Sequence, residues 1–312
     1  MILLLQYTLI YASVLLLVAL GGCFSEHSGV INLGLEGIMV MGALGGALVM
    51  KYMSASSNFS MILMVLFGSI FFGVCFSLLL AVAAINFQAD QTLVGTAMNM
   101  LATAAATVFV KAINMRENAN NVSSTIQYIK QKKVFSYSMG RFKLDFFMVL
   151  TVVVLIASVI ILYRTRFGLR LMACGEHPQA ADSVGINVYR MRYAGVMISG
   201  ALGGLGGIAY ITAGVSEWKF ENGVAGFGFL ALAVMIFGQW KPVNIALSAL
   251  LFGLLRALSN VYTGFSLLRA LNLPSTLYNM LPYIISLIVL AIFSRNSRAP
   301  KAEGIPYDKG KR

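Results

Sequence analysis

The sequence predicts an all-α protein, a polytopic helical bundle embedded in a lipid bilayer. Hydrophobic residues make up 59% of the 312 positions, charged residues only 11%, and the mean hydropathy is +0.82. Soluble domains carry about 25% charged residues. Several apolar runs approach the roughly 20 residues that a helix needs to cross a membrane. This composition argues against a water-soluble enzyme and excludes a disordered chain.

About nine apolar segments, with a range of eight to ten, are expected to form transmembrane helices. Backbone groups in hydrocarbon must be satisfied within the protein, so each span is predicted to be helical. Together the spans predict one transmembrane domain over residues 1–295, followed by a basic tail over 296–312. The predicted spans are 2–24, 36–53, 61–86, 91–113, 145–163, 193–214, 226–240, 243–264 and 279–295.

The basic residues predict which loops face the cytoplasm, because cytoplasmic loops carry an excess of Lys and Arg. From Arg295 onward the chain has six basic and two acidic residues, and the loop 164–192 has five arginines. Both are placed in the cytoplasm. The loop 114–144 and the N-terminus are then external, although this loop also holds six basic residues and is expected to form a small amphipathic element. The net charge of +12 lies mostly in loops and tail, and no basic helix with exposed aromatic residues suggests a nucleic-acid partner.

A partly polar, glycine-rich stretch joins the first two apolar segments. Its glycines weaken a helix, and Glu36 opens a strongly apolar run. An ionisable group at membrane depth is a functional-site hypothesis, and a broken helix exposes backbone donors and acceptors to a substrate. The alternative is that Glu36 caps the helix that it begins. The candidate substrate-pathway residues are Asn32, Gly34, Glu36 and Gly37.

The string Gly-Ala-Leu-Gly-Gly occurs twice, at 42–46 and at 200–204. Small residues let helix backbones approach closely where lipid offers no hydrophobic drive. We therefore expect tight helix packing, with a pathway-lining role as the alternative. The spacing of about half the chain hints at an internal repeat. Arg256 lies deep in an apolar segment and is predicted to face the protein interior.

The arginine-rich loop contains the signal of a short helix. Pro178 suits the first helical position, and Gly185 suits the residue beyond the end. The two turns between them carry small residues at Ala180, Ala181 and Val184. Because a helix this short is not stable alone, something must hold it, and its small surface would fit a groove on a cytoplasmic partner. An ordinary surface loop is the alternative.

These motifs resemble the permeases of bacterial ABC importers. The string Gln179-Ala180-Ala181-x-x-x-Gly185 keeps the spacing of their E-A-A-x-x-x-G coupling motif, with Gln in place of Glu. Residues 166–170 and 175–178 look like permeases for simple sugars and nucleosides, a family related to the branched-chain amino acid permeases. GVINLGLEGIMVMG at 29–42 and ALAVMIFGQW at 231–240 look most like the guanosine-type, nucleoside branch. The resemblance extends from about residue 20 to 295.

The resemblance implies a subunit of the bacterial plasma membrane that translocates nucleosides by alternating access, with its C-terminus in the cytoplasm. It implies a second permease (another copy or a sister subunit) and an external substrate-binding lipoprotein. It also implies a cytoplasmic ATPase, which uses ATP and Mg²⁺ and docks on the short helix. The implied coupling residues are Gly175, Glu176, His177, Pro178, Gln179, Ala180, Ala181 and Gly185.

The chain itself is predicted to be a transport subunit with no catalytic site, bound cofactor or metal. It contains no G-x-x-x-x-G-K-[ST] phosphate loop, so ATP hydrolysis must come from a separate subunit. Import of a simple sugar such as ribose, or of a riboflavin-like vitamin, is the alternative within this class. An ion-coupled secondary transporter is the alternative outside it. That mechanism favours paired acidic residues within the spans, whereas only Glu36, Asp90 and Asp145 approach span ends.

Overall fold

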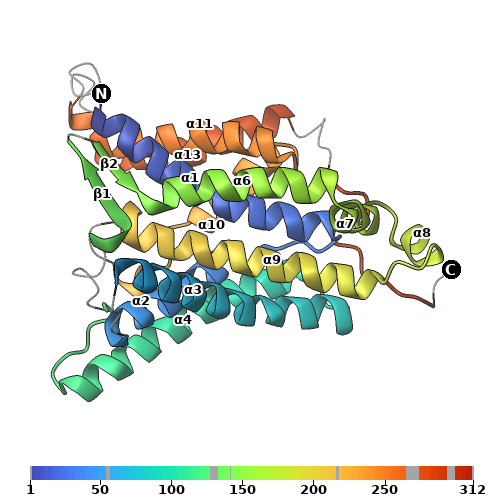
Figure 1. Cartoon of the computed structure of the whole chain (residues 1–312), viewed down its shortest axis with the longest axis horizontal. Helices are drawn as coiled ribbons and strands as arrows, with labels where there is room; N and C mark the ends of the chain where they lie inside the picture. The colour runs from blue at the N-terminus through green and yellow to red at the C-terminus, as the bar shows by residue number, and fades with distance from the viewer. Residues whose placement is uncertain are drawn as a thin grey trace.

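A computed structural model of the chain describes residues 2–53, 57–126, 133–140, 142–215, 218–264, 274–293 and 299–310. Long helices form a bundle with a two-stranded antiparallel hairpin at one end (Figure 1). The α-helices are α1 (Ile2–His27), α2 (Leu35–Tyr52), α3 (Asn58–Ala81), α4 (Gln91–Glu117), α6 (Phe146–Arg164), α7 (Arg166–Glu176), α8 (Pro178–Ser183), α9 (Val188–Ala209), α10 (Phe227–Phe237), α11 (Pro242–Val261) and α13 (Ser275–Phe293). The strands are β1 (Ser136–Met139) and β2 (Phe142–Asp145).

Short helical segments of other types extend or join these helices. The π-helical turns Val82–Asn86 and Tyr210–Gly214 continue α3 and α9, and the 3₁₀ turn Tyr262–Gly264 continues α11. Two further 3₁₀ turns, Lys133–Phe135 and Phe220–Asn222, precede the hairpin and α10. Within the described ranges, eight helices are long and apolar enough to cross a membrane. They match the first eight predicted spans to within a few residues, and α13 overlaps the ninth, so the predicted polytopic helical class is confirmed.

Polar side chains cap the beginnings of these helices and thereby fix where they start. The carboxylate of Asp90 accepts the N–H of Leu93 at the start of α4, at 2.9 Å, and Asp145 accepts the N–H of Phe147 at the start of α6, also at 2.9 Å. Such a cap contributes about 1 kcal/mol. The two aspartates that approach span ends thus have a structural role as caps.

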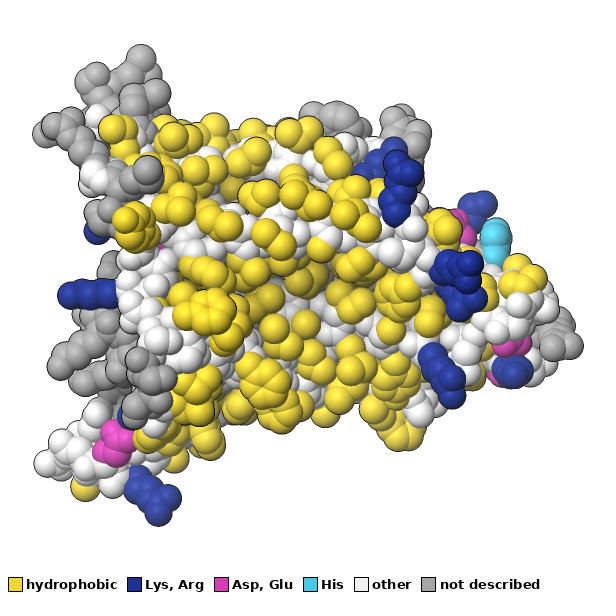
Figure 2. Space-filling model, in the orientation of Figure 1, with side chains coloured by type: hydrophobic (Ala, Val, Ile, Leu, Met, Phe, Trp, Pro, Cys, Tyr) yellow, Lys and Arg dark blue, Asp and Glu magenta, His cyan; other side chains and the backbone are white. Residues whose placement is uncertain are grey.

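The outer surface has the polarity of a membrane protein. Apolar side chains cover the middle of the bundle, and Lys and Arg gather towards its two ends (Figure 2). Large apolar side chains such as Phe67 and Met100 are 71% and 78% exposed. Exposed apolar surface this extensive is stable only against lipid or another protein.

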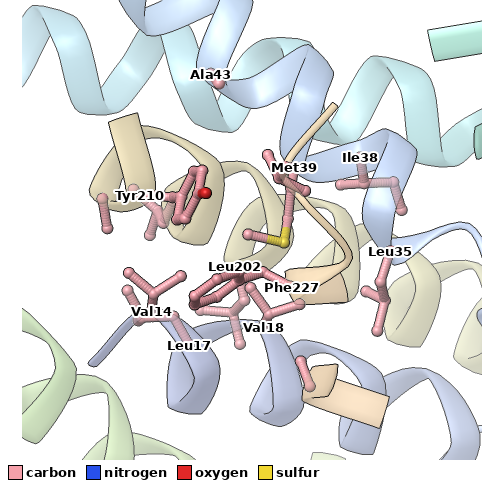
Figure 3. Packing of buried hydrophobic residues seen from close by; sticks show 14 of the residues in the cluster. Val14, Leu17, Val18, Leu35, Ile38, Met39, Ala43, Leu202, Tyr210 and Phe227 are labelled. Atoms are coloured by element: carbon pink, nitrogen blue, oxygen red, sulfur yellow. The ribbon is translucent and has the colours of Figure 1, made fainter. Parts of the chain in front are cut away.

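The core lies where α1, α2, α9 and α10 meet. Aliphatic side chains of these helices interdigitate around the rings of Tyr210 and Phe227 (Figure 3). The residues labelled there are Val14, Leu17 and Val18 of α1, Leu35, Ile38, Met39 and Ala43 of α2, Leu202, Tyr210 and Phe227. This packing brings the two glycine clusters of the sequence together.

The glycine clusters pack α2, α3 and α9 directly against one another, which confirms the tight packing expected from the sequence. A side-chain carbon at Gly42 would collide with the backbone of Gly204, and one at Gly73 would collide with the carbonyl of Gly200. The repeated strings therefore meet in space. A residue larger than glycine would force the helices apart.

The loops predicted to lie on opposite sides of the membrane lie at opposite ends of the bundle. One end carries α7, α8 and residues 299–310, and is called the α8 end here (Figure 1). The other carries the N-terminus and the hairpin, and is called the hairpin end. The described part of the loop 114–144 contains β1 and β2, with Ser136 opposite Asp145, as its ordered element. Residues 299–310, expected to belong to a basic tail, pack against the α8 end.

Candidate functional site

The helix break predicted around Gly34 is present. Residues 28–34 form an irregular, mostly buried loop between α1 and α2. Side chains satisfy backbone donors of this loop: the N–H of Ile31 donates to the Gln91 side chain at 2.7 Å, and the N–H of Gly34 donates to Asn32 Oδ1 at 3.1 Å. Irregular backbone at membrane depth requires such partners. The loop is therefore a defined part of the fold, held by these hydrogen bonds.

Glu36 lies in the first turn of α2, and its carboxylate binds the start of another helix. Its Oε1 accepts the N–H of Gly226 at 2.8 Å, and its Oε2 accepts the N–H of Gly228 at 2.7 Å. These donors belong to the beginning of α10, where N–H groups have no partner within the helix. The side chain is 8% exposed. Glu36 thus caps α10, which lies 190 residues further along the chain, rather than the helix that it begins.

The N-termini of a long helix, α2, and of a short helix, α10, meet at this carboxylate. The 11 residues of α10 span about 16 Å, roughly half of the 30 Å hydrocarbon core. Its N-cap, Gly226, has a φ of +79°, a left-handed conformation that glycine adopts without strain. The N-termini of α2 and α10 both place positive dipole ends near Glu36, and these stabilise its negative charge. The junction resembles the discontinuous helices around which transporters build substrate sites.

A groove begins at Glu36 and follows α4; most of its lining surface is apolar, and polar side chains follow one another along it. Its volume is about 800 Å³, within the range of small-molecule sites. The groove is lined by Glu36, Thr96, Asn99, Met100, Thr103, Ala104, Thr107, Val108, Glu221, Asn222, Gly223 and Phe229. From Thr96 to Val108 the helix rises about 18 Å, so the groove covers more than half of a bilayer core.

One face of α4 supplies the polar wall of the groove. Thr96, Asn99, Thr103 and Thr107 follow one another at intervals of three or four residues, which places them on one side of a helix. Asn99 also fixes the start of α2, because its Oδ1 accepts the N–H of Gly37 at 2.8 Å. The sequence analysis did not select these four residues. Their periodic spacing in an otherwise apolar span was the signal that could have identified them.

The structure gives different positions to the four predicted pathway residues. Glu36 lines the groove. Asn32 is fully buried behind it, where its Nδ2 donates to Ser199 Oγ at 2.8 Å. Gly34 and Gly37 allow α4 to approach closely, since a side-chain carbon at Gly37 would lie 2.9 Å from the carbonyl oxygen of Met98. Glu36 therefore lies at the groove surface, whereas Asn32, Gly34 and Gly37 lie behind it and help to position the surrounding backbone.

Arg256 lies beside the same junction, on α11. Its guanidinium carbon is 5.6 Å from the centre of the Phe227 ring, the first residue of α10. A cation over an aromatic face is attracted by the ring quadrupole. Its Nε is buried and has no hydrogen-bond partner among the described residues. The neighbour that the structure gives Arg256 is therefore an aromatic ring at the start of α10.

The second candidate site is the short helix α8, which begins at Pro178 as predicted. Gly185 follows its end with a φ of +82°. Ala181 is 4% exposed and packs with Cys174, Val188 and Tyr307.

Pro178 is buried as well, and the exposed surface of the short helix is formed by Gln179, Ala180 and Ser183, with Val184 directly after it. Ala180 is exposed, and Val184 is 73% exposed. Of the remaining predicted coupling residues, Glu176, His177 and Gln179 are exposed, whereas Gly175 is buried. The three residues of the expected small surface are thus separated: Ala180 and Val184 are exposed, whereas Ala181 packs against its own subunit.

A helical membrane bundle in which two helix N-termini meet beside a groove, with a short exposed helix at one end, defines a membrane transport subunit. The comparison with known families agrees. Residues 4–290 match the family described as the permease component of the branched-chain amino acid transport system. The chain belongs to this permease family.

Individual relatives match over almost the whole chain. The guanosine ABC transporter permease protein NupQ of Bacillus subtilis is 40% identical over 309 residues, which cover 98% of this chain and 96% of that protein. The nucleoside ABC transporter permease protein NupC of Lactococcus lactis is 40% identical over 316 residues, with coverages of 97% and 96%. A Haloferax volcanii protein provisionally named as a glucose ABC transporter permease, TsgC13, is 32% identical over 277 residues, with coverages of 87% and 81%.

Proposed function

We propose that this chain is the membrane-spanning subunit of an ATP-driven importer of nucleosides, and that substrate moves along the groove beside α4. The observation that carries the proposal is the groove itself, which lays threonine and asparagine side chains along a membrane-spanning helix. The two relatives named for nucleosides support the substrate class.

The chemistry of the groove suits an uncharged, hydroxyl-rich ligand with a flat ring. Thr96, Thr103 and Asn222 offer hydroxyl and amide groups that both donate and accept hydrogen bonds. The Asn99 amide instead bonds the backbone of Gly37 and Leu33 and supports the groove. Phe229, which is 47% exposed, offers an aromatic face on which a base can stack. Ribose hydroxyls and base edges need this combination.

A second permease is proposed to cover the groove. A polar wall on a spanning helix is unfavourable against lipid, where hydrogen-bonding groups find no partners. Against a second copy or a sister subunit, the same wall encloses an aqueous route. The substrate would be delivered at the hairpin end by an external binding lipoprotein and released at the α8 end.

The α8 end is proposed to face the cytoplasm and to bind the ATPase through the exposed side of α8. Gln179, Ala180 and Val184 would form this contact, while the neighbouring Ala181 anchors the helix to its own subunit. ATP and Mg²⁺ would be used by the partner, and this chain would contribute no catalytic group.

The test is ATP-dependent uptake by proteoliposomes that contain this chain, its ATPase, any sister permease and the binding lipoprotein. Labelled guanosine, adenosine, uridine, ribose, glucose and riboflavin form the panel. Saturable uptake of a nucleoside, competed by other nucleosides and not by sugars, is expected. Uptake of ribose, glucose or riboflavin alone would overturn the substrate class. Uptake driven by an ion gradient without the ATPase would overturn the proposed function.

The groove is tested by a matched pair of threonine substitutions. Thr103→Val removes a groove hydroxyl, and Thr8→Val removes a hydroxyl on α1, outside the groove lining; each hydroxyl also bonds the carbonyl four residues earlier. Loss of one hydrogen bond to substrate costs about 0.5–1.5 kcal/mol. The Thr103 variant should therefore raise KM by roughly two- to tenfold, with the Thr8 variant near wild type. Equal KM values would argue against substrate contact at Thr103.

A further inference from the structure

Residues 299–310, called the strap here, lie folded against the α8 end. This segment holds two basic and two acidic residues and so carries no net charge, and its Ala302 and Tyr307 are only 6% and 3% exposed. A turn over residues 301–304 brings the backbone back onto the bundle. The strap therefore forms part of the folded permease, and its contacts can be followed one by one.

The first half of the strap bonds to the loop 28–34 and to the end of α7. The N–H of Ala302 donates to the carbonyl of Gly175 at 2.8 Å, and the N–H of Gly304 donates to the carbonyl of Gly29 at 3.2 Å. Gly304 has a φ of +75°, and a side-chain carbon there would lie 2.7 Å from Ile31 Cδ1. This half is thus fitted to the loop that leads to Glu36.

The second half of the strap packs on α8 and on the start of α9. Tyr307 shares a buried cluster with Ala181 of α8, and its ring lies 5.4 Å from that of Tyr189 on α9. Lys309 Nζ is 4.0 Å from the Asp182 carboxylate of α8. A helix of six residues is not stable alone, so these contacts help to hold α8 in place.

Arg192, on α9, contacts the strap from the bundle side, where its two halves meet. Its side chain is 1% exposed, and its guanidinium donates to the carbonyl of Ile305 at 3.0 Å and lies 5.9 Å from the Tyr307 ring. A side-chain carbon at Gly29 would approach this guanidinium to 3.0 Å. A buried charge requires such partners, and the strap supplies two of them. Detaching the strap would leave Arg192 without these two contacts.

We propose that the strap transmits movement of α8 to the loop 28–34, and so links ATPase docking to the junction at Glu36. The inference rests on the proposed function. Its physical basis is that backbone hydrogen bonds tie the strap to the loop, while buried ring contacts tie it to α8. Movement of α8 against the bundle must then pull on the loop, whose last residue lies two positions before Glu36.

The test uses the complete importer in proteoliposomes and a matched pair of glycine substitutions. Gly304→Val places a β-branched residue at a positive φ and against Ile31, which separates the strap from the loop but leaves its α8 contacts in place. Gly310→Val makes the same change six residues later, where a side-chain carbon would have only an ordinary contact with Asp308 at 3.4 Å. The readouts are retention of the ATPase, ATP hydrolysis and substrate transported per ATP.

We expect the Gly304 variant to retain its ATPase and to hydrolyse ATP, but to transport at least about fivefold less substrate per ATP, the lower end of typical coupling energies. The Gly310 variant should match wild type. If the Gly304 variant does not fold, Gly304→Ala provides a milder displacement with the same expected direction. Unchanged transport per ATP in a folded variant, or loss of ATPase binding itself, would overturn the proposal. Failure of the wild-type importer would instead count against the proposed function.

Discussion

Glu36 and Glu303 are carboxyl groups largely removed from water, and they differ in their hydrogen-bond partners. Glu36 accepts two backbone N–H groups at a helix start, so hydrogen bonds and the helix dipole stabilise its charge. Glu303, on the strap, lies beside the Glu26 carboxyl. Its Oε2 has no hydrogen-bond partner within the part of the chain that the structure describes. Burial raises the pKa of Glu303 to about 7.

Glu36→Gln is expected to destabilise the junction of α2 and α10. Glutamine offers one acceptor oxygen where two N–H groups need one each, so its amide would face an N–H as a second donor. The cost should be roughly 1–3 kcal/mol, measured as the unfolding midpoint in detergent. Glu221→Gln is the control, because Glu221 forms only an exposed ion pair with Lys111, and exposed pairs contribute little to stability. Equal midpoints for the two variants would contradict the capping role of Glu36.

Docking of the strap is expected to weaken as pH rises. The carboxyl of Glu303 has an ordinary pKa of 4.5 when free and about 7 when docked, so docking binds a proton between these values. The stabilisation is complete below pH 4.5 and is lost as pH rises through 7. A spin label at Lys301→Cys, with Cys75→Ser as background, should become more mobile between pH 5 and 8. Glu303→Gln should abolish this pH-dependent change in mobility, whereas Asp308→Asn should leave it intact. If the change persists in the Glu303→Gln variant, a group other than Glu303 is responsible for it.

Among the elements, α8 shows how a six-residue helix can serve two surfaces. Pro178 and Ala181 are buried against the permease, whereas Gln179 and Ala180 are exposed. Successive residues of a helix differ by about 100° in direction, so neighbouring alanines necessarily face different ways. The adjacent small residues Ala180 and Ala181 therefore do not form one docking surface: Ala181 anchors the helix, and Ala180 is available to a partner.

The two alanines are expected to respond differently to the same substitution. Ala180→Arg should abolish co-purification of the ATPase while leaving the unfolding midpoint of the permease near wild type, because the side chain projects outward. Ala181→Arg should lower that midpoint, since it places a charge in the cluster with Cys174 and Tyr307. The measurement is ATPase capture on tagged permease together with thermal unfolding. Normal ATPase capture by a folded Ala180 variant would exclude α8 as the docking element.

The elements themselves were predictable because their signals are local. Hydropathy located the spans, glycine and polar residues located the break at 28–34, and Pro178 with Gly185 located α8. The partners of these elements were not predictable in the same way. That Glu36 caps α10 depends on two segments 190 residues apart, and no local pattern near Glu36 encodes that distance. The groove face of α4 was missed because four polar residues hardly change the mean hydropathy of a long apolar span.

At the scale of the whole molecule, the sequence predicts loops on two sides of the membrane. In the structure these loops lie at opposite ends of the bundle (Figure 1). The basic loop 114–144 had opposed the positive-inside pattern. Its described part forms the hairpin at the end away from α8, so this loop and the loop 164–192 lie at opposite ends of the bundle. The charge pattern is a statistical bias, whereas the alternation of helix directions is a geometric constraint. The folded position of the strap was missed because the basic residues that flank it, Arg298, Lys311 and Arg312, gave residues 296–312 the composition of a solvated tail.

Opposite ends of the molecule should react from opposite sides of the membrane. We expect Tyr137→Cys on the hairpin, where the native side chain is 71% exposed, to react with an impermeant maleimide on intact cells. Val184→Cys beside α8 should react only after permeabilisation. Cys75→Ser removes the exposed native thiol, while Cys23 and Cys174 are buried. Labelling of both positions from the same side would contradict the arrangement, and reversed labelling would invert the proposed orientation.

The glycine contacts among α2, α3 and α9 have a mechanical consequence. At Gly42, Gly73 and Gly204 no side chain separates the backbones, so these helices interlock and cannot slide or rotate past one another without collision. A close-packed unit of this kind moves as a rigid body, and conformational change is displaced to its borders. Since Glu36 belongs to α2, its carboxylate moves with this unit. The close contact of Gly37 with Met98 and the hydrogen bond from Gly37 to Asn99 extend the same packing to α4, so the groove is built on the border of a rigid body.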